Sequence, residues 1–424
     1  MSALLDDLRF RGLIHQTTSD ELGPHLEKTG RRVYAGFDPT RDALTIGNLL
    51  PILLLRRFQL AGHRPVVVMG GGTGLVGDPS GKESERPFLS PEEIRHNVES
   101  QRVTFARLLN FDGPHAADLV DNASWLSSVS FLDLLRDVGK HFSVNAMIQK
   151  DSVRERLQNR EQGITYTEFS YMILQAYDFR HLYDQYGVTL QVGGSDQWGN
   201  ILGGVDLIKR TRHAESFGLS VPLLTKSDGR KFGKTEDGAV WLSAKRTSPY
   251  AFYQFWLNAA DDDVGRFLRI FTLLGRTELE ALEADHATRR EQRVAQHVLA
   301  EHVTALVHGE QATAQAKQAS EALFSGEVAT LDADSLEQVF ADAPSSQHAR
   351  SLLEGEGLLA VDLLTLTGVA GSKREAREWL SGGAISINGS KVGVDYRLQS
   401  ERLLHGSVAL IRRGKKTWHV ARWQ

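Results

Sequence analysis

The feature that most constrains this chain is the alternation of short apolar strands with helices in its N-terminal half. Residues 32–36 and 64–70 have the composition of buried strands, and residues 189–192 form a third such segment. Apolar residues at helical spacing predict helices over residues 47–62 and 166–183. Strands that alternate with helices pair in parallel, because each helix carries the chain back along the sheet. We therefore predict an α/β domain whose parallel sheet is covered on both faces.

The chain changes character twice after this α/β region. Residues 249–325 are rich in Ala, Leu, Glu and Arg and lack strand patterns, which predicts a helical domain. Residues 357–424 hold two helical segments followed by short strands with glycine turns, which predicts a small α+β domain. We therefore expect domains at residues 1–248, 249–325 and 357–424, with residues 326–356 as a linker.

Charge is distributed unevenly along the chain, although its net value at pH 7 is only −4. Residues 371–424 hold eleven lysines and arginines against four acids, a net charge of +7, so the preceding residues carry −11. An acidic body with a basic end is typical of proteins that bind a polyanion at that end. A solvated charged surface explains the same asymmetry equally well.

The composition excludes several classes of protein. There are no cysteines, so the chain has no disulfide, no Cys-ligated zinc and no catalytic thiol. The longest strongly apolar run, residues 49–55, is far too short to cross a bilayer, and residues 1–12 lack the apolar core of a signal peptide. We therefore expect a cytoplasmic protein without a membrane segment.

Two glycine-rich patterns suggest nucleotide chemistry without completing a known fingerprint. Residues 72–77 fit G-x-G-x-x-G, but residues 78–81 break the helix that a dinucleotide site needs there, which disfavours a dehydrogenase. Gly81 and Lys82 lack the first glycine and the final Ser/Thr of a phosphate loop. This segment is either a loop that closes over phosphate through its amides, Lys82 and Arg86, or a plain surface loop.

A polar stripe runs along the predicted helix of residues 166–183. Tyr171, Gln175 and Asp178 are spaced to share one helix face, and their neighbours are apolar. Such a stripe faces either solvent or a polar cavity, and the pattern alone favours solvent.

Two further segments suit a bound nucleotide. Residues 191–198 follow a strand, where ligands of open α/β sheets bind, and the paired Gly193 and Gly194 let a ligand approach the backbone. Asp196 can accept ribose hydroxyls, whereas the spacing does not fit the G-x-S-x-G of a serine hydrolase. Residues 231–235 read Lys-Phe-Gly-Lys-Thr, which suits either a mobile clamp on a triphosphate or a solvated loop.

Taken together and in order, these segments resemble bacterial tyrosyl-tRNA synthetases from end to end. The similar stretches are residues 34–40 (YAGFDPT), 74–82 (GLVGDPSGK), 167–171 (TEFSY), 193–200 (GGSDQWGN) and 231–235 (KFGKT), the last being similar to the class I loop KMSKS. The family implies a Rossmann-type catalytic domain, a helical anticodon-binding domain and a C-terminal RNA-binding domain of the ribosomal-protein S-four type.

The resemblance also implies which residues form the sites. The expected contacts of tyrosine are Tyr34 and Asp178 at its hydroxyl, Asp78, Tyr171 and Gln175 at its amino group, Gln197 at its carboxylate, and Asp38 close by. The expected contacts of ATP and its phosphates are Thr40, Thr45, Asn48, Lys82, Arg86, Gly194, Asp196, Lys231, Lys234 and Thr235. The expected contacts of tRNA are Lys373, Arg374, Arg377, Arg412, Arg413, Lys415 and Lys416.

The reaction that the family implies has two steps. The carboxylate of L-tyrosine attacks the α-phosphate of ATP, which enters with Mg²⁺, and tyrosyl-adenylate and pyrophosphate form. The terminal ribose hydroxyl of tRNA(Tyr) then takes the tyrosyl group. The family further implies a homodimer, and we expect no tightly bound cofactor and no metal site in the protein.

One departure from the family stands at its first signature. Where the class usually has His-Ile/Leu-Gly-His, this chain has Thr45, Ile46, Gly47 and Asn48. Thr45 and Asn48 both keep a side-chain hydrogen-bond donor, so we expect activity.

Three alternatives compete with this interpretation. A synthetase-like RNA-binding or regulatory paralogue is supported by Thr45 and Asn48 but not by the lysine loop and the full set of tyrosine-pocket residues. A nucleotidyltransferase that adenylates another carboxylate has no use for the helical and RNA-binding domains. Tryptophanyl-tRNA synthetase is the nearest relative in the class, but Tyr34 with Asp178 favours tyrosine.

Overall fold

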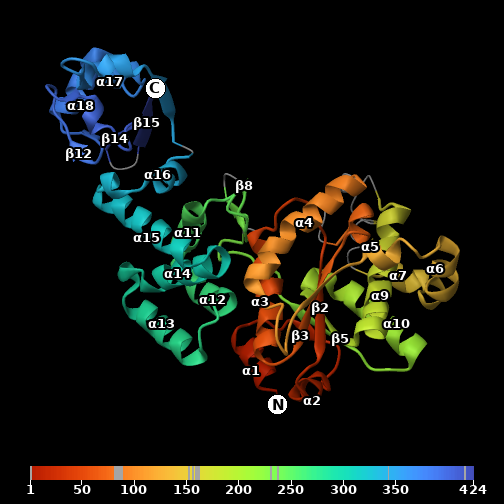
Figure 1. The fold of residues 1–424 in the computed structure, drawn as a ribbon. Coiled ribbons are helices and arrows are strands. Elements are labelled where there is room, and N and C mark those ends of the chain that lie inside the picture. The colour runs from red at the N-terminus through yellow and green to blue at the C-terminus, as the bar shows by residue number, and fades with distance from the viewer. Residues whose placement is uncertain are drawn as a thin grey trace. The chain divides into compact units, whose positions relative to one another are not determined.

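The computed structural model of the chain describes residues 2–80, 89–150, 153–154, 157, 163–229, 232–235, 238–341, 343–414 and 417–424. The chain forms two compact units, whose elements Figure 1 labels. The first unit contains residues 1–247 and 258–307, and the second contains residues 248–257 and 308–424.

The first unit is built on a six-stranded sheet in the order β1-β6-β5-β2-β3-β4. Its strands are β1 (Gln16–Thr17), β2 (Arg32–Phe37), β3 (Arg64–Met69), β4 (Asp118–Asp121), β5 (Val188–Gly194) and β6 (Phe217–Val221). Every neighbouring pair is parallel except the short edge strand β1 with β6. The predicted α/β fold with a parallel sheet is therefore confirmed.

Helices pack on both faces of this sheet. The helices of the first unit are α1 (Ala3–Phe10), α2 (Leu22–Glu27), α3 (Ile46–Leu60), α4 (Pro91–Leu108), α5 (Ala123–Leu126), α6 (Phe131–Asp137), α7 (Val144–Ile148), α9 (Tyr166–Tyr186), α10 (Trp198–Arg212), α12 (Asp261–Phe271), α13 (Arg276–Thr288) and α14 (Val294–His308). From β2 the sheet grows outward through α3 to β3, and from β5 it grows the opposite way through α10 to β6. Right-handed crossovers in opposite directions place α3 and α10 on opposite faces.

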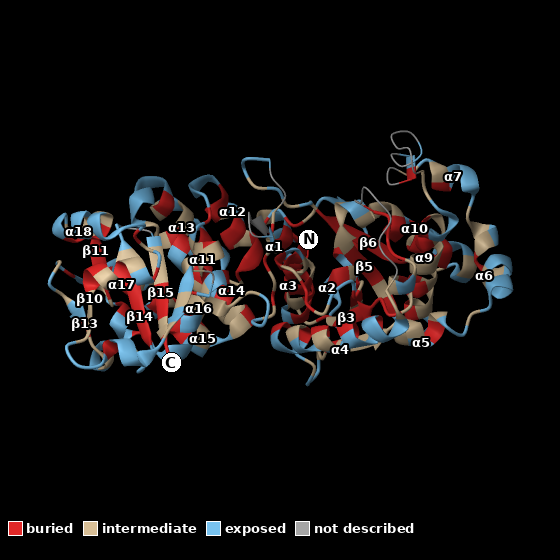
Figure 2. Cartoon of the chain, turned by 90° about the horizontal axis from the view of Figure 1, so that it is seen from above, coloured by how far each residue is buried: buried red, intermediate tan, exposed pale blue. Residues whose placement is uncertain are grey.

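Local sequence explains where these elements begin and end. Strand β3 is a Val-rich run with five of its six residues buried, as expected for a parallel strand covered on both faces (Figure 2). Helix α4 begins at a capping box in which Glu93 N donates to Ser90 Oγ at 3.2 Å, with Pro91 at its first position. Helix α9 ends at Gly187, whose φ of 67° is left-handed.

Two buried arginines cap the C-terminal end of α12. Arg57 donates to the carbonyl oxygens of Ile270 at 2.8 Å and Thr272 at 2.7 Å, and Arg11 donates to that of Arg269 at 2.9 Å. Burial lowers the pKa of Arg57 to about 9. These bonds satisfy carbonyls that the end of a helix leaves without partners, and they join α3 to the helices of residues 261–308.

The second unit combines helices with a five-stranded sheet in the order β12-β11-β14-β15-β9. Its helices are α11 (Pro249–Leu257), α15 (Glu310–Ser325), α16 (Ala333–Val339), α17 (Ala360–Leu366) and α18 (Lys373–Ser381). Its strands are β9 (Ser345–His348), β10 (Leu358–Leu359), β11 (Ile385–Ile387), β12 (Ser390–Lys391), β13 (Arg397–Leu398), β14 (Val408–Arg413) and β15 (Thr417–Trp423). The strand β9, from the range expected to be a linker, pairs in parallel with β15.

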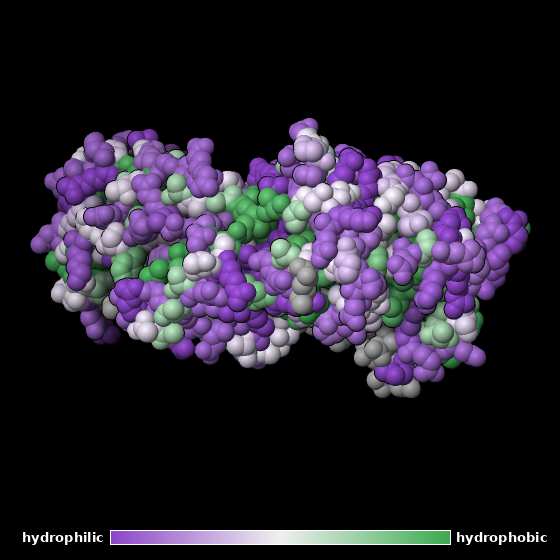
Figure 3. Space-filling view, turned by 90° about the horizontal axis from the view of Figure 1, so that it is seen from below, coloured by the Kyte–Doolittle hydropathy of each residue, from purple (hydrophilic) through white to green (hydrophobic). Residues whose placement is uncertain are grey.

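The surface is largely polar. Hydrophilic residues cover most of the face that Figure 3 shows, and hydrophobic residues gather there in a few patches. Among the described residues, no helix combines the length and the apolar character that crossing a membrane requires.

Candidate active site

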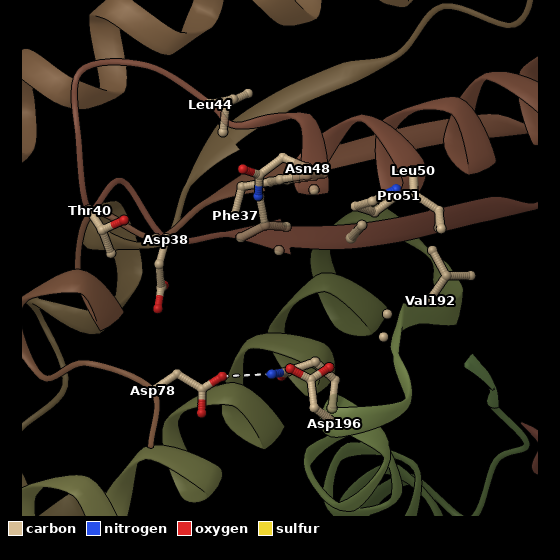
Figure 4. A pocket seen from close by; sticks show the side chains of 18 of the residues that line it. Phe37, Asp38, Thr40, Leu44, Asn48, Leu50, Pro51, Asp78, Val192 and Asp196 are labelled. Atoms are coloured by element: carbon tan, nitrogen blue, oxygen red, sulfur yellow. Dashed lines mark hydrogen bonds between the residues drawn. The ribbon is translucent and has the colours of Figure 1, made fainter. Parts of the chain in front are cut away.

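A cavity of about 550 Å³ opens at the carboxyl ends of the parallel strands in the first unit. The sheet reverses its order between β2 and β5, and both strands contribute residues to the cavity lining. Ligands of open α/β sheets bind at such a reversal, because the crossover helices diverge there and leave a crevice. Figure 4 shows side chains of β2, α3, β5 and their following loops turned toward this space.

The cavity brings together every expected site residue of the first unit whose side chain the structure describes. These lining residues are Tyr34, Asp38, Thr40, Thr45, Asn48, Asp78, Tyr171, Gln175, Asp178, Gly194, Asp196 and Gln197. Lys82, Arg86 and Lys231 lie outside the described residues. The backbone of Lys234 and Thr235 forms β7, which pairs with β8 (Gly238–Ala239), but their side chains are not described.

Two donors from the segment after β4 bind Asp178, which lies on α9. Trp125 Nε1 donates to Asp178 Oδ1 at 2.7 Å, and Asn122 Nδ2 donates to Asp178 Oδ2 at 2.9 Å. Burial raises the pKa of Asp178 to about 7, although these two hydrogen bonds oppose the shift. The site therefore holds a carboxylate that is costly to keep charged without a further donor.

Three buried polar atoms on this side of the cavity have no hydrogen-bond partner among the described residues. They are Tyr34 Oη, Gln175 Oε1 and Gln191 Oε1. Tyr34 and Gln191 stand opposite each other on the paired strands β2 and β5. Burial, and then the charge of Asp178, raises the pKa of Tyr34 well above its usual value, so the phenol stays protonated. Because unpartnered buried polar groups are costly, these atoms mark where a polar ligand fits.

A second carboxylate, Asp38, is bound from two sides. Tyr171 Oη donates to Asp38 Oδ2 at 3.1 Å, and Thr73 Oγ1 donates to Asp38 Oδ1 at 3.0 Å. Asn122 links this group to Asp178, because its Nδ2 also donates to Thr73 Oγ1 at 2.9 Å. The pattern of residues 171–178 favoured solvent for the polar stripe, and that prediction is wrong, because Tyr171 and Asp178 are buried and line the cavity.

The third carboxylate, Asp78, lies across the cavity from β2 (Figure 4). Gln197 Nε2 donates to Asp78 Oδ2 at 2.7 Å, and Asn200 Nδ2 donates to Gln197 Oε1 at 3.3 Å. These bonds fix which end of the Gln197 amide faces Asp78. With Asp196, four carboxylates line the cavity, which favours a cationic group, such as an ammonium, in the ligand.

The loop after β5 comes close to the carboxylate of Asp196. A Cβ at Gly194, the last residue of β5, would collide with Asp196 Oδ1, so a larger residue there would have to displace that carboxylate.

The helix α3 begins at the cavity edge. Thr45 is its N-cap, and both the backbone N and the Oγ1 of Thr45 donate to Asn48 Oδ1, at 3.0 and 3.1 Å. Phe232 and Trp241, from the segment that contains β7 and β8, line the same edge.

Four residues of the cavity network carry no sequence motif that marks them. Thr73 binds Asp38, Asn122 and Trp125 bind Asp178, and Gln191 stands opposite Tyr34, yet none of the four was singled out. Asn122 directly follows β4 and Thr73 lies in the segment after β3, so polar residues beyond the carboxyl ends of the strands were the available signal.

The expected RNA contacts lie in the second unit. Lys373, Arg374 and Arg377 are exposed on α18, and Lys373 pairs with Asp362 at 2.7 Å. Arg413, at the end of β14, lies over the Trp379 ring of α18, with its guanidinium carbon 4.5 Å from the ring centre. Arg412 lies similarly over Trp418, whereas Lys415 and Lys416 are outside the described residues.

Comparison with known proteins gives consistent matches over the whole chain. Residues 27–325 match the family described as tRNA synthetases class I (W and Y), and residues 335–421 match the C-terminal domain of the SYY-like tyrosine–tRNA ligases. The tyrosine–tRNA ligase of Roseiflexus castenholzii is 51% identical over 424 residues, which is all of both chains. That of Geobacillus stearothermophilus is 49% identical over 99% of each chain.

Solved structures agree with these sequence matches. A C-terminally truncated mitochondrial tyrosyl-tRNA synthetase of Aspergillus nidulans superimposes with a TM-score of 0.69 at 29% identity, covering 76% of this chain and 95% of that one. The corresponding protein of Coccidioides posadasii gives a TM-score of 0.66 at 30% identity, covering 75% and 92%.

Proposed function

This chain belongs to the class I tRNA synthetases of the tryptophan and tyrosine group, and we propose how its cavity performs that family's reaction on tyrosine. The enzyme is a tyrosine–tRNA ligase, which joins tyrosine to tRNA at the expense of ATP. Identity of about one half to tyrosine–tRNA ligases over the full chain favours an active enzyme over an RNA-binding paralogue.

One observation carries the assignment of the tyrosine pocket. Tyr34 Oη, without a partner among the described residues, and the Asp178 carboxylate lie at the same buried side of the cavity. A substrate phenol there donates its hydrogen to Asp178 and accepts one from Tyr34. Phenylalanine leaves Tyr34 Oη without an acceptor and gives Asp178 no further donor, which makes the pocket selective for tyrosine.

The amino group of tyrosine is assigned to the acidic part of the cavity. Asp78 and Gln175, together with the Tyr171–Asp38 pair, offer the acceptors that an ammonium group needs. Gln197 is assigned to the carboxylate of tyrosine, because its amide orientation is already fixed by Asn200. The substrate carboxylate is thereby aimed away from the phenol pocket, toward the start of α3.

The nucleotide is assigned to the remaining edge of the cavity. Gly194 and Asp196 are to contact the ribose, and Asn48 is to touch the nucleotide. The resemblance assigns the phosphates to Thr40, Thr45, Lys82, Arg86, Lys231, Lys234 and Thr235. Mg²⁺ enters as part of the ATP substrate, bound to phosphate oxygens. The chain supplies no covalent nucleophile in this scheme: it aligns the tyrosine carboxylate with the α-phosphate and stabilises the charge that develops on the phosphates.

The second step requires the tRNA, which we assign to the second unit. The exposed basic residues of α18 and the arginines of β14 suit contacts to phosphates, which are strong but not sequence-specific. The helical segment of residues 249–325 is proposed to contact the anticodon. Transfer to tRNA takes place in the cytoplasm in this proposal.

We also propose that the enzyme is a homodimer. Helix α6 buries none of its residues, and its Phe131 and Leu132 are 59% and 76% exposed. Val144 on α7 is exposed as well, so two neighbouring helices offer apolar side chains that a second copy of the chain can cover.

Pyrophosphate exchange tests the proposed function. The purified protein is incubated with ATP, labelled pyrophosphate and each of the twenty amino acids in turn. Exchange with tyrosine alone is the expected result. A folded protein that exchanges with no amino acid, or with another one, would contradict the assignment of the cavity.

A further inference from the structure

The start of α3 contains a hydrogen-bond arrangement that fixes the orientation of one amide. Asn48 Oδ1 lies 3.0 Å from the backbone N of Thr45 and 3.1 Å from Thr45 Oγ1. A backbone N–H can only donate, so the amide atom that faces it must be the oxygen. The amide nitrogen of Asn48 is thereby turned away from Thr45, and Figure 4 shows it on the side of the cavity where Asp78 and Asp196 lie.

The same arrangement uses the single hydrogen of the Thr45 hydroxyl. Asn48 Oδ1 has no hydrogen to give, so the contact of 3.1 Å requires that Thr45 Oγ1 donates. The hydroxyl then presents only lone pairs to a ligand. Phosphate oxygens are acceptors too, so Thr45 cannot donate to them while it holds Asn48.

From this geometry we propose that Thr45 is a positioning residue, which holds the Asn48 amide so that Nδ2 donates to an oxygen of the nucleotide. Thr45 then makes no phosphate contact of its own, in contrast to the role that the sequence suggests. The inference rests on the proposed function, because it assigns a role to a residue of the same nucleotide site. It explains how a chain without either signature histidine keeps one well-oriented donor at the start of α3.

In addition to the capping box at Thr45, two backbone hydrogen bonds that do not involve its hydroxyl hold the start of α3. Ile46 N donates to Val240 O at 2.9 Å, and Leu242 N donates to Leu44 O at 2.8 Å. These two bonds hold the chain on either side of Thr45 against the segment that follows β8. Removal of the hydroxyl therefore releases the Asn48 side chain without releasing the start of the helix.

A double-mutant cycle tests the proposal. Tyrosine-dependent pyrophosphate exchange is measured for the wild type, Thr45→Val, Asn48→Ala and the double variant, with Thr45→Ser as the conservative control. We expect Asn48→Ala to lower kcat roughly 10–100-fold, since a lost transition-state donor costs about this much or more. Thr45→Val should lower kcat about 5–10-fold, the scale of one hydrogen bond, with KM for tyrosine unchanged. Thr45→Ser should remain close to the wild type.

The double variant shows whether Thr45 acts through Asn48. If Thr45 acts through Asn48, the double variant is no slower than Asn48→Ala, because the residue that Thr45 positions is already gone. The proposal is wrong if Thr45→Val slows exchange by the same factor in the wild type and in Asn48→Ala, or if it slows exchange in neither. Thr45 then does not act through Asn48.

A further variant separates catalysis from folding. Asn48→Asp keeps an acceptor for both Thr45 hydrogen bonds but loses the donor, so exchange should fall as in Asn48→Ala while the melting temperature is held. Unchanged exchange in Asn48→Asp would overturn the role of Nδ2. Failure of the wild type to exchange with tyrosine would instead remove the proposed function itself.

Discussion

Replacement of Asp178 by asparagine removes one ionisable group from the proposed tyrosine pocket. The carboxylate is 4% exposed and accepts hydrogen bonds from Trp125 and Asn122. Asparagine has nearly the same shape but cannot ionise. Asp178→Asn therefore tests both the recognition of the substrate hydroxyl and the cost of burying this charge.

The expected effect on specificity follows from one hydrogen bond. A hydrogen bond from the substrate phenol to a charged acceptor contributes about 1.5–3 kcal/mol. Its loss should lower kcat/KM for tyrosine roughly 10–150-fold, at about 1.4 kcal/mol for each factor of ten. Phenylalanine makes no such bond and should lose nothing. The preference for tyrosine over phenylalanine should therefore fall at least about tenfold.

The expected effect on stability depends on pH. Burial raises the pKa of Asp178 from 3.8 to about 7, so the folded protein keeps a proton that the unfolded chain releases. The stability from that retained proton is complete below pH 3.8 and is lost as pH rises through about 7. Above this range the buried charge costs on the order of 4 kcal/mol, at 1.36 kcal/mol per pKa unit.

Asparagine avoids that cost but cannot accept hydrogen bonds from both Trp125 and Asn122. One unpartnered donor costs about 1–3 kcal/mol. The variant should therefore be more stable than the wild type by about 1–3 kcal/mol at pH 8, and no more stable at pH 4.

Two assays check these expectations. Pyrophosphate exchange with tyrosine and with phenylalanine gives the specificity ratio, and thermal melting without substrate at pH 4 and pH 8 gives the stability. Asp184→Asn is the matched control, since Asp184 lies on the same helix but pairs with Arg212 outside the cavity. An unchanged specificity ratio would refute the assignment of Asp178 to the substrate hydroxyl. The charge argument is refuted if the difference in stability between Asp178→Asn and the wild type is the same at pH 4 and at pH 8.

Four further predictions concern other parts of the chain. Tyr34→Phe should lower kcat/KM for tyrosine about fivefold, the scale of one neutral hydrogen bond, without lowering the melting temperature, since the hydroxyl has no partner among the described residues. Arg57→Ala should destabilise the protein by about 3 kcal/mol in urea unfolding, because buried carbonyls at the end of α12 lose their donor; a cost below about 1 kcal/mol would contradict this role. A chain that ends at residue 341, before β9, should exchange pyrophosphate with tyrosine but fail to charge tRNA, and intact charging would refute the assignment of the second unit. If the proposed homodimer forms through α6 and α7, Leu132→Asp should convert it to monomers in light scattering, and an unchanged dimer mass would place the interface elsewhere.

Short-range patterns in the sequence determine much of the fold of this protein and of its cavity lining. The alternation of strands and helices predicts the parallel sheet, and the Ser90–Glu93 capping box predicts where α4 begins. Motif resemblance predicts the cavity residues because they lie within short segments at strand ends, such as residues 34–40 and 193–197. Each of these signals is read from residues that are near one another in the chain.

Only the tertiary structure decides which of these segments contact one another. The pattern of the polar stripe favoured solvent, but the meeting of α9 with the ends of β2, β3 and β4 buries Asp178 against Asn122 and Trp125. These partners are 56 and 53 residues apart in the chain, so no local pattern contains them. The order of strands in the sheet determines which strand ends are neighbours. That order determines which donors hold each carboxylate. It also buries Asp178, which raises the pKa of this residue, and leaves Tyr34 Oη without a partner among the described residues.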